Sequence, residues 1–146
     1  MAEDLRRQIS LRMVIVARQM RGRFDKAVAS KGVTRAQWTV IAVVASNPGA
    51  TQRVISEHLE ISEVSAGRLV DRLSAEGLVE RRRKEDDKRA HAIYLTEAGE
   101  RLTGELSELA RDAERSAFAT FSHDELTEML RLLEKMAVNL GAQPDC

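Results

Sequence analysis

Residues 78–95 interrupt a sequence that otherwise has the apolar periodicity of α-helices. Leu78 and Val79 lead into a run of charged residues that extends to Arg89. The residues that follow have the character of a β-strand: Ala92, Ile93, Tyr94 and Leu95. Two short strand-like runs joined by a charged loop predict one β-hairpin. We therefore expect a mainly α chain that contains a single hairpin.

The helices on either side of this hairpin are marked by their ends. The first is long, because apolar residues recur every three or four positions from Leu5 to Val28. The N-caps expected for the later helices are Thr34, Thr51, Ser62, Thr96 and Ser122. Capping boxes reinforce two of them, with glutamine or glutamate three residues later: Thr34 with Gln37 and Ser122 with Glu125. The expected stops are Gly32, the turn at 47–49, Gly77 and Gly141.

The helices that begin after Thr51 and Ser62 are separated only by Glu60 and Ile61, which is typical of a helix-turn-helix. The hairpin that follows makes it winged. The terminal helices, residues 1–32 and 100–141, have apolar stripes too long for so small a central module to cover. We therefore expect one domain, residues 1–146, with a mainly α winged helix-turn-helix fold. In it the long N- and C-terminal helices form a homodimer and residues 34–99 form a separate lobe.

The charge is unevenly distributed, although 23 basic and 23 acidic residues balance over the whole chain. Residues 1–35 carry nine basic and three acidic side chains, whereas residues 96–146 carry five basic and eleven acidic side chains. Opposite charge at the two ends favours packing of the first helix against the last ones. Solvated helix faces explain the same distribution equally well.

Several classes of protein are disfavoured. The single cysteine, Cys146, argues against a disulfide framework. The three histidines lie in different predicted elements, so we expect no metal site and no cofactor. No hydrolase signature or phosphate-binding loop supports an enzyme. We expect no signal peptide and no membrane span, since no apolar run approaches about 20 residues. A cytoplasmic protein is the default expectation.

Three motifs resemble those of the MarR family of bacterial transcriptional regulators. They are residues 65–81, then Asp87-Lys88-Arg89-Ala90, then Leu95-Thr96-Glu97-Ala98-Gly99. In that family they correspond to the recognition helix, the wing and the start of the next helix, in this order. One departure is that the family often has Asp-Pro before the wing tip, where this chain has Lys84-Glu85. The resemblance implies double-stranded DNA as a partner.

The predicted recognition helix has side chains suited to DNA on one face. Ser65, Arg68 and Arg72 are spaced three and four residues apart, and Ser62 lies at the helix start. An arginine here can bind a guanine edge in the major groove, while hydroxyls bind bases or phosphates. Alternatively, the serines only cap the helix and Arg68 pairs with Asp71. Gly67 costs about 1 kcal/mol in mid-helix, so we expect a close approach there to DNA or to a neighbouring helix.

The wing offers a second set of contacts. The resemblance assigns Arg89 to the minor groove, with Asp87 as the group that orients it, Lys88 between them and Arg83 as a further contact. Alternatively, the wing cations only neutralise the wing carboxylates on a solvated hairpin. Arg53 and Arg72 are further candidates for phosphate contacts.

An effector site is expected near the end of the first helix. The resemblance implies small aromatic acids or phenolics that bind between the dimerisation helices and the DNA-binding lobe. Arg18, Arg21 and Arg35 with Trp38 would suit a planar carboxylate. Alternatively, these arginines pair with acidic residues of the C-terminal part and Trp38 is plain core.

From these features together we expect a homodimeric repressor that binds a pseudo-palindromic operator and is released by an aromatic effector. The alternative is a helical protein-interaction module that does not bind DNA.

Overall fold

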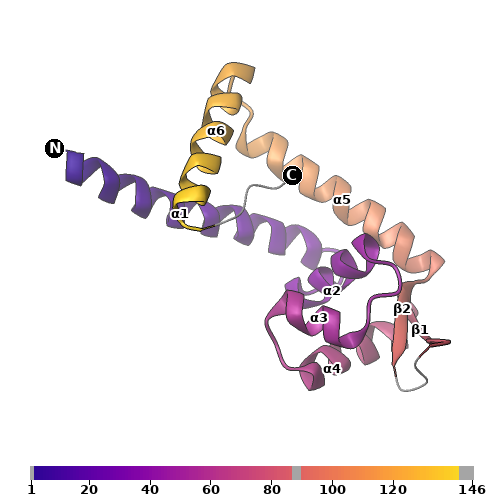
Figure 1. Ribbon diagram of the computed structural model, residues 1–146. Coiled ribbons are helices and arrows are strands. Elements are labelled where there is room, and N and C mark those ends of the chain that lie inside the picture. The colour runs from indigo at the N-terminus through magenta and orange to yellow at the C-terminus, as the bar shows by residue number, and fades with distance from the viewer. Residues whose placement is uncertain (1, 87–89, 142–146) are drawn as a thin grey trace. The chain divides into compact units, whose positions relative to one another are not determined.

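Residues 2–86 and 90–141 are described by the computed structural model (Figure 1). The wing residues Asp87, Lys88 and Arg89, and also Cys146, lie outside the described residues. The chain forms two compact units, residues 1–113 and residues 114–146. The single domain expected over residues 1–146 stays a prediction.

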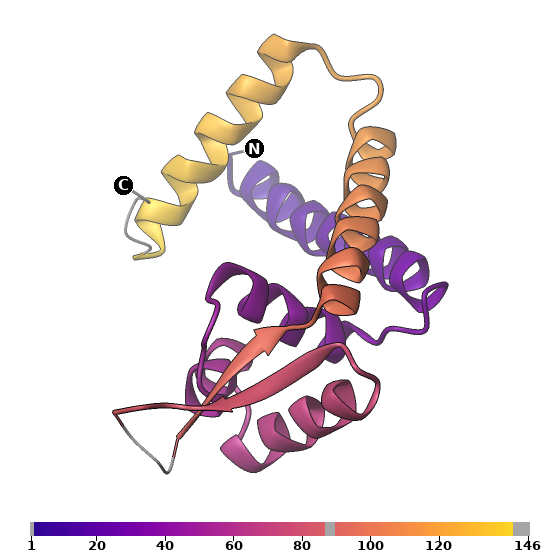
Figure 2. The same ribbon diagram turned by 90° about the vertical axis from the view of Figure 1, so that its right-hand side faces the viewer.

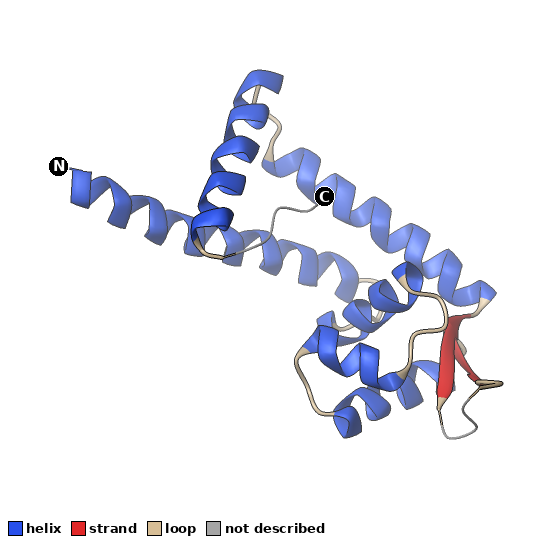
Figure 3. Cartoon of the chain, viewed as in Figure 1, coloured by secondary structure: helices blue, strands red, loops and turns tan. Residues whose placement is uncertain are grey.

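The first unit contains the predicted order of helices and one hairpin (Figures 1 and 3). Its elements are α1 (Ala2–Ala29), α2 (Arg35–Ser46), α3 (Gln52–Leu59), α4 (Glu63–Ala75), β1 (Val79–Arg83), β2 (His91–Leu95) and most of α5 (Glu97–Ala117). The second unit contains the end of α5 and α6 (His123–Asn139). The mainly α winged helix-turn-helix is confirmed.

The local signals at the helix ends are confirmed as well. Thr34 with Gln37 and Ser122 with Glu125 both form complete capping boxes. Thr51 and Ser62 cap α3 and α4 through their side chains. One boundary differs, because α5 ends at Ala117 and not near Phe121. Phe118 and Phe121 instead pack edge to face, with ring centroids 5.7 Å apart, in the turn before α6.

The hairpin is antiparallel, and its register runs from Val79 opposite Leu95 to Arg83 opposite His91. The segment before α3 pairs with β2 through one isolated bridge, between Ala50 and Ile93. Gly49 donates to the carbonyl of Ile93, and Ile93 donates to the carbonyl of Ala50, each at 3.0 Å. The base of the wing is therefore hydrogen-bonded to the α2–α3 connection.

The core of the first unit joins α2, α3, α4 and the base of the hairpin. Its largest buried side chains include Ile41, Ile55, Val70, Leu73 and Ile93. A smaller cluster of Val28, Val33 and Leu106 joins the end of α1 to α5, with Phe24 and Trp38 packed against it. Figure 2 shows the hairpin running beside α4.

Each unit, taken by itself, leaves apolar side chains of a long helix uncovered. On α1 the exposed apolar side chains are Leu5, Ile9, Leu11, Val14, Ile15, Val16 and Met20. The second unit has no buried side chain on α6, where the exposed ones include Leu130, Leu132, Leu133 and Val138. No helix in the described part of the chain is long and apolar enough to cross a bilayer.

Candidate nucleic-acid interface

The turn between α3 and α4 sets the direction of the predicted recognition helix. Glu60 ends α3 in the left-handed region, with φ of 54° and ψ of 42°. The amide of Ile61 then donates back to the carbonyl of Ser56 at 3.1 Å. Ser62 follows in an extended conformation and accepts a hydrogen bond from the amide of Ser65. These contacts end one helix and begin the next within three residues.

Gly67 lies where α4 passes close to α3. A Cβ atom at this position would lie 2.7 Å from Nε2 of Gln52, too close for an ordinary contact. The same Nε2 donates to the carbonyl of Glu63 at 2.8 Å. The sequence left two explanations for this glycine, a close approach to DNA or to a neighbouring helix. The structure shows the close approach to a neighbouring helix.

The exposed edge of α4 carries Ser65, Arg68 and Arg72. Within residues 2–86 and 90–141 neither arginine has a carboxylate partner. The alternative pairing of Arg68 with Asp71 is absent there, because Asp71 binds Arg81 of the hairpin. Ser62 does act as the cap, since its hydroxyl accepts from the Ser65 amide at 3.1 Å, and it also donates to the Ser65 hydroxyl at 3.0 Å. Among the described residues, this edge therefore presents two guanidinium groups without a carboxylate partner, Arg68 in the middle of α4 and Arg72 in its last turn.

The arginines of β1 differ in whether they form an ion pair. Arg81 is bound to α4, and Arg82 pairs with Glu80 while lying 4.3 Å from the centre of the Tyr94 ring. Arg83 has no carboxylate partner in the described part of the hairpin. The alternative in which the wing charges only neutralise one another thus holds for Arg82 and leaves Arg83 available. Nothing in the structure bears on Asp87, Lys88 and Arg89.

Arg53 lies on an exposed face in the first turn of α3, as expected for a phosphate contact. Its Nε donates to Glu57 at 3.1 Å, one turn along the same helix. An exposed pair of this kind is weak, so a phosphate can compete with Glu57 for the guanidinium.

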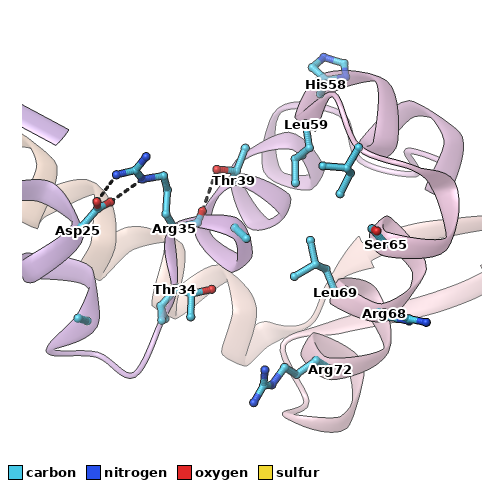
Figure 4. A pocket seen from close by; sticks show the side chains of 14 residues that line it. Asp25, Thr34, Arg35, Thr39, His58, Leu59, Ser65, Arg68, Leu69 and Arg72 are labelled. Atoms are coloured by element: carbon cyan, nitrogen blue, oxygen red, sulfur yellow. Dashed lines mark hydrogen bonds and ion pairs between the residues drawn. The ribbon is translucent and has the colours of Figure 1, made fainter. Parts of the chain in front are cut away.

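A groove of about 1060 Å³ lies between the α1–α2 region and α3–α4 (Figure 4). Leu59 and Leu69 point into it, whereas the Arg68 side chain points away from it (Figure 4). Of the four predicted effector residues only Arg35 lines this groove. Trp38 instead packs against Phe24, with ring centroids 5.6 Å apart. The structure thus separates Trp38 from the groove wall.

Arg35 already has a partner in the groove wall. It donates from Nε to Oδ1 of Asp25 at 2.9 Å and from a second guanidinium nitrogen to Oδ2 (Figure 4). This hydrogen-bonded pair holds the pKa of Asp25 below its ordinary value of 3.8, with a smaller contribution from the charge of Arg21. An anionic effector that binds Arg35 must therefore displace Asp25 or share its guanidinium. Arg18 and Arg21 are exposed on α1 and do not line the groove.

The sequence reasoning missed two pairings that shape this surface, Asp71 with Arg81 and Asp25 with Arg35. Each pair joins residues ten positions apart on different elements, so helical spacing gives no sign of it. Gln52 was also missed, although the mid-helix glycine it contacts was a signal that a neighbour approaches closely.

Sequence comparison finds relatives of this chain among known proteins. The model of the MarR family matches residues 31–90. The HTH-type transcriptional regulator PetP of Rhodobacter capsulatus is 30% identical over 112 residues, which cover 77% of this chain and 68% of PetP. The HTH-type transcriptional regulator BilQ of Clostridium symbiosum is 26% identical over 106 residues, which cover 73% of this chain and 74% of BilQ.

Solved structures share the fold. One mutant of S. aureus MepR superposes with a TM-score of 0.81 at 22% identity, covering 90% of this chain and 97% of MepR. A second MepR mutant, solved bound to an oligodeoxyribonucleotide, has a TM-score of 0.67 at 22% identity with the same coverage. This chain belongs to the MarR family of transcriptional regulators and carries its DNA-binding winged helix.

Proposed function

We propose that this protein is a homodimeric repressor that binds a pseudo-palindromic DNA operator, one half-site per subunit. The observation that carries this proposal is a set of guanidinium groups without a carboxylate partner among the described residues: Arg68 and Arg72 on one edge of α4 and Arg83 on the hairpin. Most other arginines nearby are held in ion pairs, so these three remain available for DNA. Arg68 reads a base edge in the major groove, and Arg72 and Arg53 bind phosphates.

Further contacts follow from the sequence motif. Arg89 enters the minor groove with Asp87 orienting its guanidinium, and Arg83 and Lys88 bind the backbone beside it. The hydroxyls of Ser62 and Ser65 stand at the N-terminus of α4, where they bind bases or phosphates in addition to capping the helix.

The test begins with selection of an operator from a pool of random duplexes by the wild-type protein. Arg68→Ala should then cost roughly 1–3 kcal/mol on the selected operator and much less on random duplex. Arg53→Ala, the matched control, should weaken both alike. Failure of the wild-type protein to enrich any duplex would favour the alternative, a protein-interaction module without DNA binding. Repression is tested by transcription in vitro from a promoter that overlaps the selected operator.

Dimerisation through the terminal helices is supported by their exposed apolar side chains. Seven of these lie on α1 between Leu5 and Met20, and a second group lies on α6. Covering such a surface with a second copy of the chain is the simplest way to remove it from water. Sedimentation should show a dimer, and deletion of the chain after Phe121 should abolish it. A truncated chain that stays folded, monomeric and DNA-binding would contradict this assignment.

We propose further that a small aromatic acid or phenolic releases the protein from DNA. The groove supports this, since it joins apolar side chains with the Arg35 guanidinium beside the helix that carries Arg68. Titration with benzoate-like and phenolic acids should change the fluorescence of Trp38, the only tryptophan, and release the operator. Arg35→Ala should weaken the response, and Arg18→Ala, which lies outside the groove, should weaken it only if the effector also contacts α1. A full response in both variants would place the effector elsewhere.

A further inference from the structure

Arg81 ties the wing to the recognition helix. Its guanidinium donates to the Asp71 carboxylate of α4 at 2.5 Å and to the carbonyl of Gly67 at 3.4 Å. Arg81 is 29% exposed at its side chain, while Asp71 is 67% exposed. One side chain of β1 therefore binds two successive turns of α4.

In the described part of the wing, burial decreases from the base of the hairpin outward. Val79 and Ile93 are buried at the base of the hairpin, whereas Arg83 and His91, which pair at its other end, are exposed. Arg81 lies opposite Ile93, at the last position of β1 on this face before the strand leaves the core. At the outer limit of this base, the guanidinium of Arg81 adds polar contacts that link the hairpin to α4.

The two positions that Arg81 binds lie next to the predicted DNA-reading residues. Gly67 directly precedes Arg68, and Asp71 directly precedes Arg72. Successive residues of a helix point about 100° apart, so holding residues 67 and 71 toward the wing sets the direction of residues 68 and 72. A rotation of α4 about its own axis would break both hydrogen bonds of Arg81.

We propose that Arg81 is a positioning residue that fixes the rotation of α4 relative to the wing through Asp71 and Gly67, so that both elements meet the same DNA site together. This inference rests on the proposed DNA-binding function. Arg81 itself is held by the protein and does not neutralise a phosphate. Its effect on DNA binding passes through Arg68 and the wing.

The direction in which Asp71→Ala changes operator affinity separates a positioning role from an effect of charge alone. Removal of an acidic side chain beside DNA should strengthen binding if charge alone matters, because phosphate repulsion is reduced. If Asp71 holds Arg81, Asp71→Ala should instead weaken binding to the selected operator by about tenfold or more. Glu63→Ala is the matched control, since it removes the same charge from the first turn of α4. Among the described residues, the Glu63 carboxylate forms no ion pair. Glu63→Ala should leave operator affinity unchanged or raise it.

Affinity for the operator and for random duplex would be measured by fluorescence anisotropy at several salt concentrations. Asp71→Ala should lose affinity for the operator, keep its affinity for random duplex and keep its salt slope. Asp71→Asn, which retains an acceptor for Arg81, should lose less. In an Arg81→Ala background, Asp71→Ala should have no further effect. The thermal midpoint of Asp71→Ala should stay within about 3 °C of wild type, because exposed ion pairs add little stability.

Each contrary result is informative. An Asp71→Ala variant that binds the operator as tightly as Glu63→Ala would overturn the proposal. A salt slope reduced by about one charge per subunit in Arg81→Ala, with Asp71→Ala neutral, would make Arg81 a phosphate contact instead. If the wild-type protein selects no duplex, the proposed function fails before this inference is reached.

Discussion

Gly99 should be the glycine at which an added methyl group costs most. It lies in the first turn of α5, where the helix passes over the backbone at the start of the hairpin. A Cβ atom there would lie 2.1 Å from the carbonyl oxygen of Leu78. Thr96 holds this crossing together, since its amide donates to Leu78 at 3.1 Å and its hydroxyl donates to Gly77 at 2.6 Å. The same hydroxyl accepts from the Gly99 amide at 3.1 Å.

The magnitude follows from these contacts. Relief of the clash in Gly99→Ala requires a backbone shift of roughly 1 Å, and overpacking of this kind costs about 1–3 kcal/mol. Loss of the Thr96 cap adds about 0.5–2 kcal/mol. The gain in helix propensity returns about 1 kcal/mol. We therefore expect Gly99→Ala to lower the free energy of unfolding by about 0.5–4 kcal/mol.

The assay is urea unfolding followed by circular dichroism at one protein concentration. Gly104→Ala is the matched control, because it lies in the same helix and its Cβ would meet no described atom within 4 Å outside the helix backbone. That variant should gain up to about 1 kcal/mol. If Gly99→Ala is as stable as Gly104→Ala, the close crossing of α5 over Leu78 is wrong.

Three further predictions concern other parts of the first unit. Arg83→Ala should flatten the plot of log affinity against log salt by about one charge per subunit, measured on random duplex; an unchanged slope would show that this arginine does not touch phosphate. Because the pKa of Asp25 is lowered in the folded state, its pair with Arg35 stabilises the protein above pH 3.8 and loses this effect as the pH falls through the lowered pKa. Asp25→Asn should therefore be less stable than wild type near neutral pH, with a difference that shrinks in acid; a difference that is constant with pH would count against the pair. Gly67→Ala should change unfolding free energy by less than about 1 kcal/mol, because the flexible end of Gln52 can move aside while helix propensity improves; a loss of several kcal/mol would show that Gln52 cannot move.

The sequence predicts the helix ends well because their causes are local. Thr34 and Gln37 are three residues apart, and their reciprocal hydrogen bonds need nothing from the rest of the chain. The ion-pair partner of Asp71, in contrast, could not be predicted from local spacing. Arg68 is one turn away on the same helix, yet the carboxylate binds Arg81, which reaches it only because the hairpin packs beside α4. Ion pairs between elements depend on the tertiary fold, so spacing along the chain cannot predict them.

In the candidate effector site as well, local structure can be predicted from the sequence and contacts between elements cannot. The position of Arg35 at the start of α2 follows from the local capping signal, but its partner Asp25 comes from the end of α1. Trp38, one turn along, was expected beside a ligand because of its chemistry. It faces Phe24 instead, since a ring between two apolar clusters removes more surface from water there.

The internal pairing of so many arginines also bears on how the protein searches for its site. A DNA-binding protein with many free cations is held by any stretch of duplex, and most of its molecules then occupy the genome at random. Here the chain has no net charge, and Arg81 and Arg82 of the hairpin are already bound to carboxylates. We therefore expect weak attraction to random duplex, which would leave more molecules free in solution and let a modest number of copies fill a specific site.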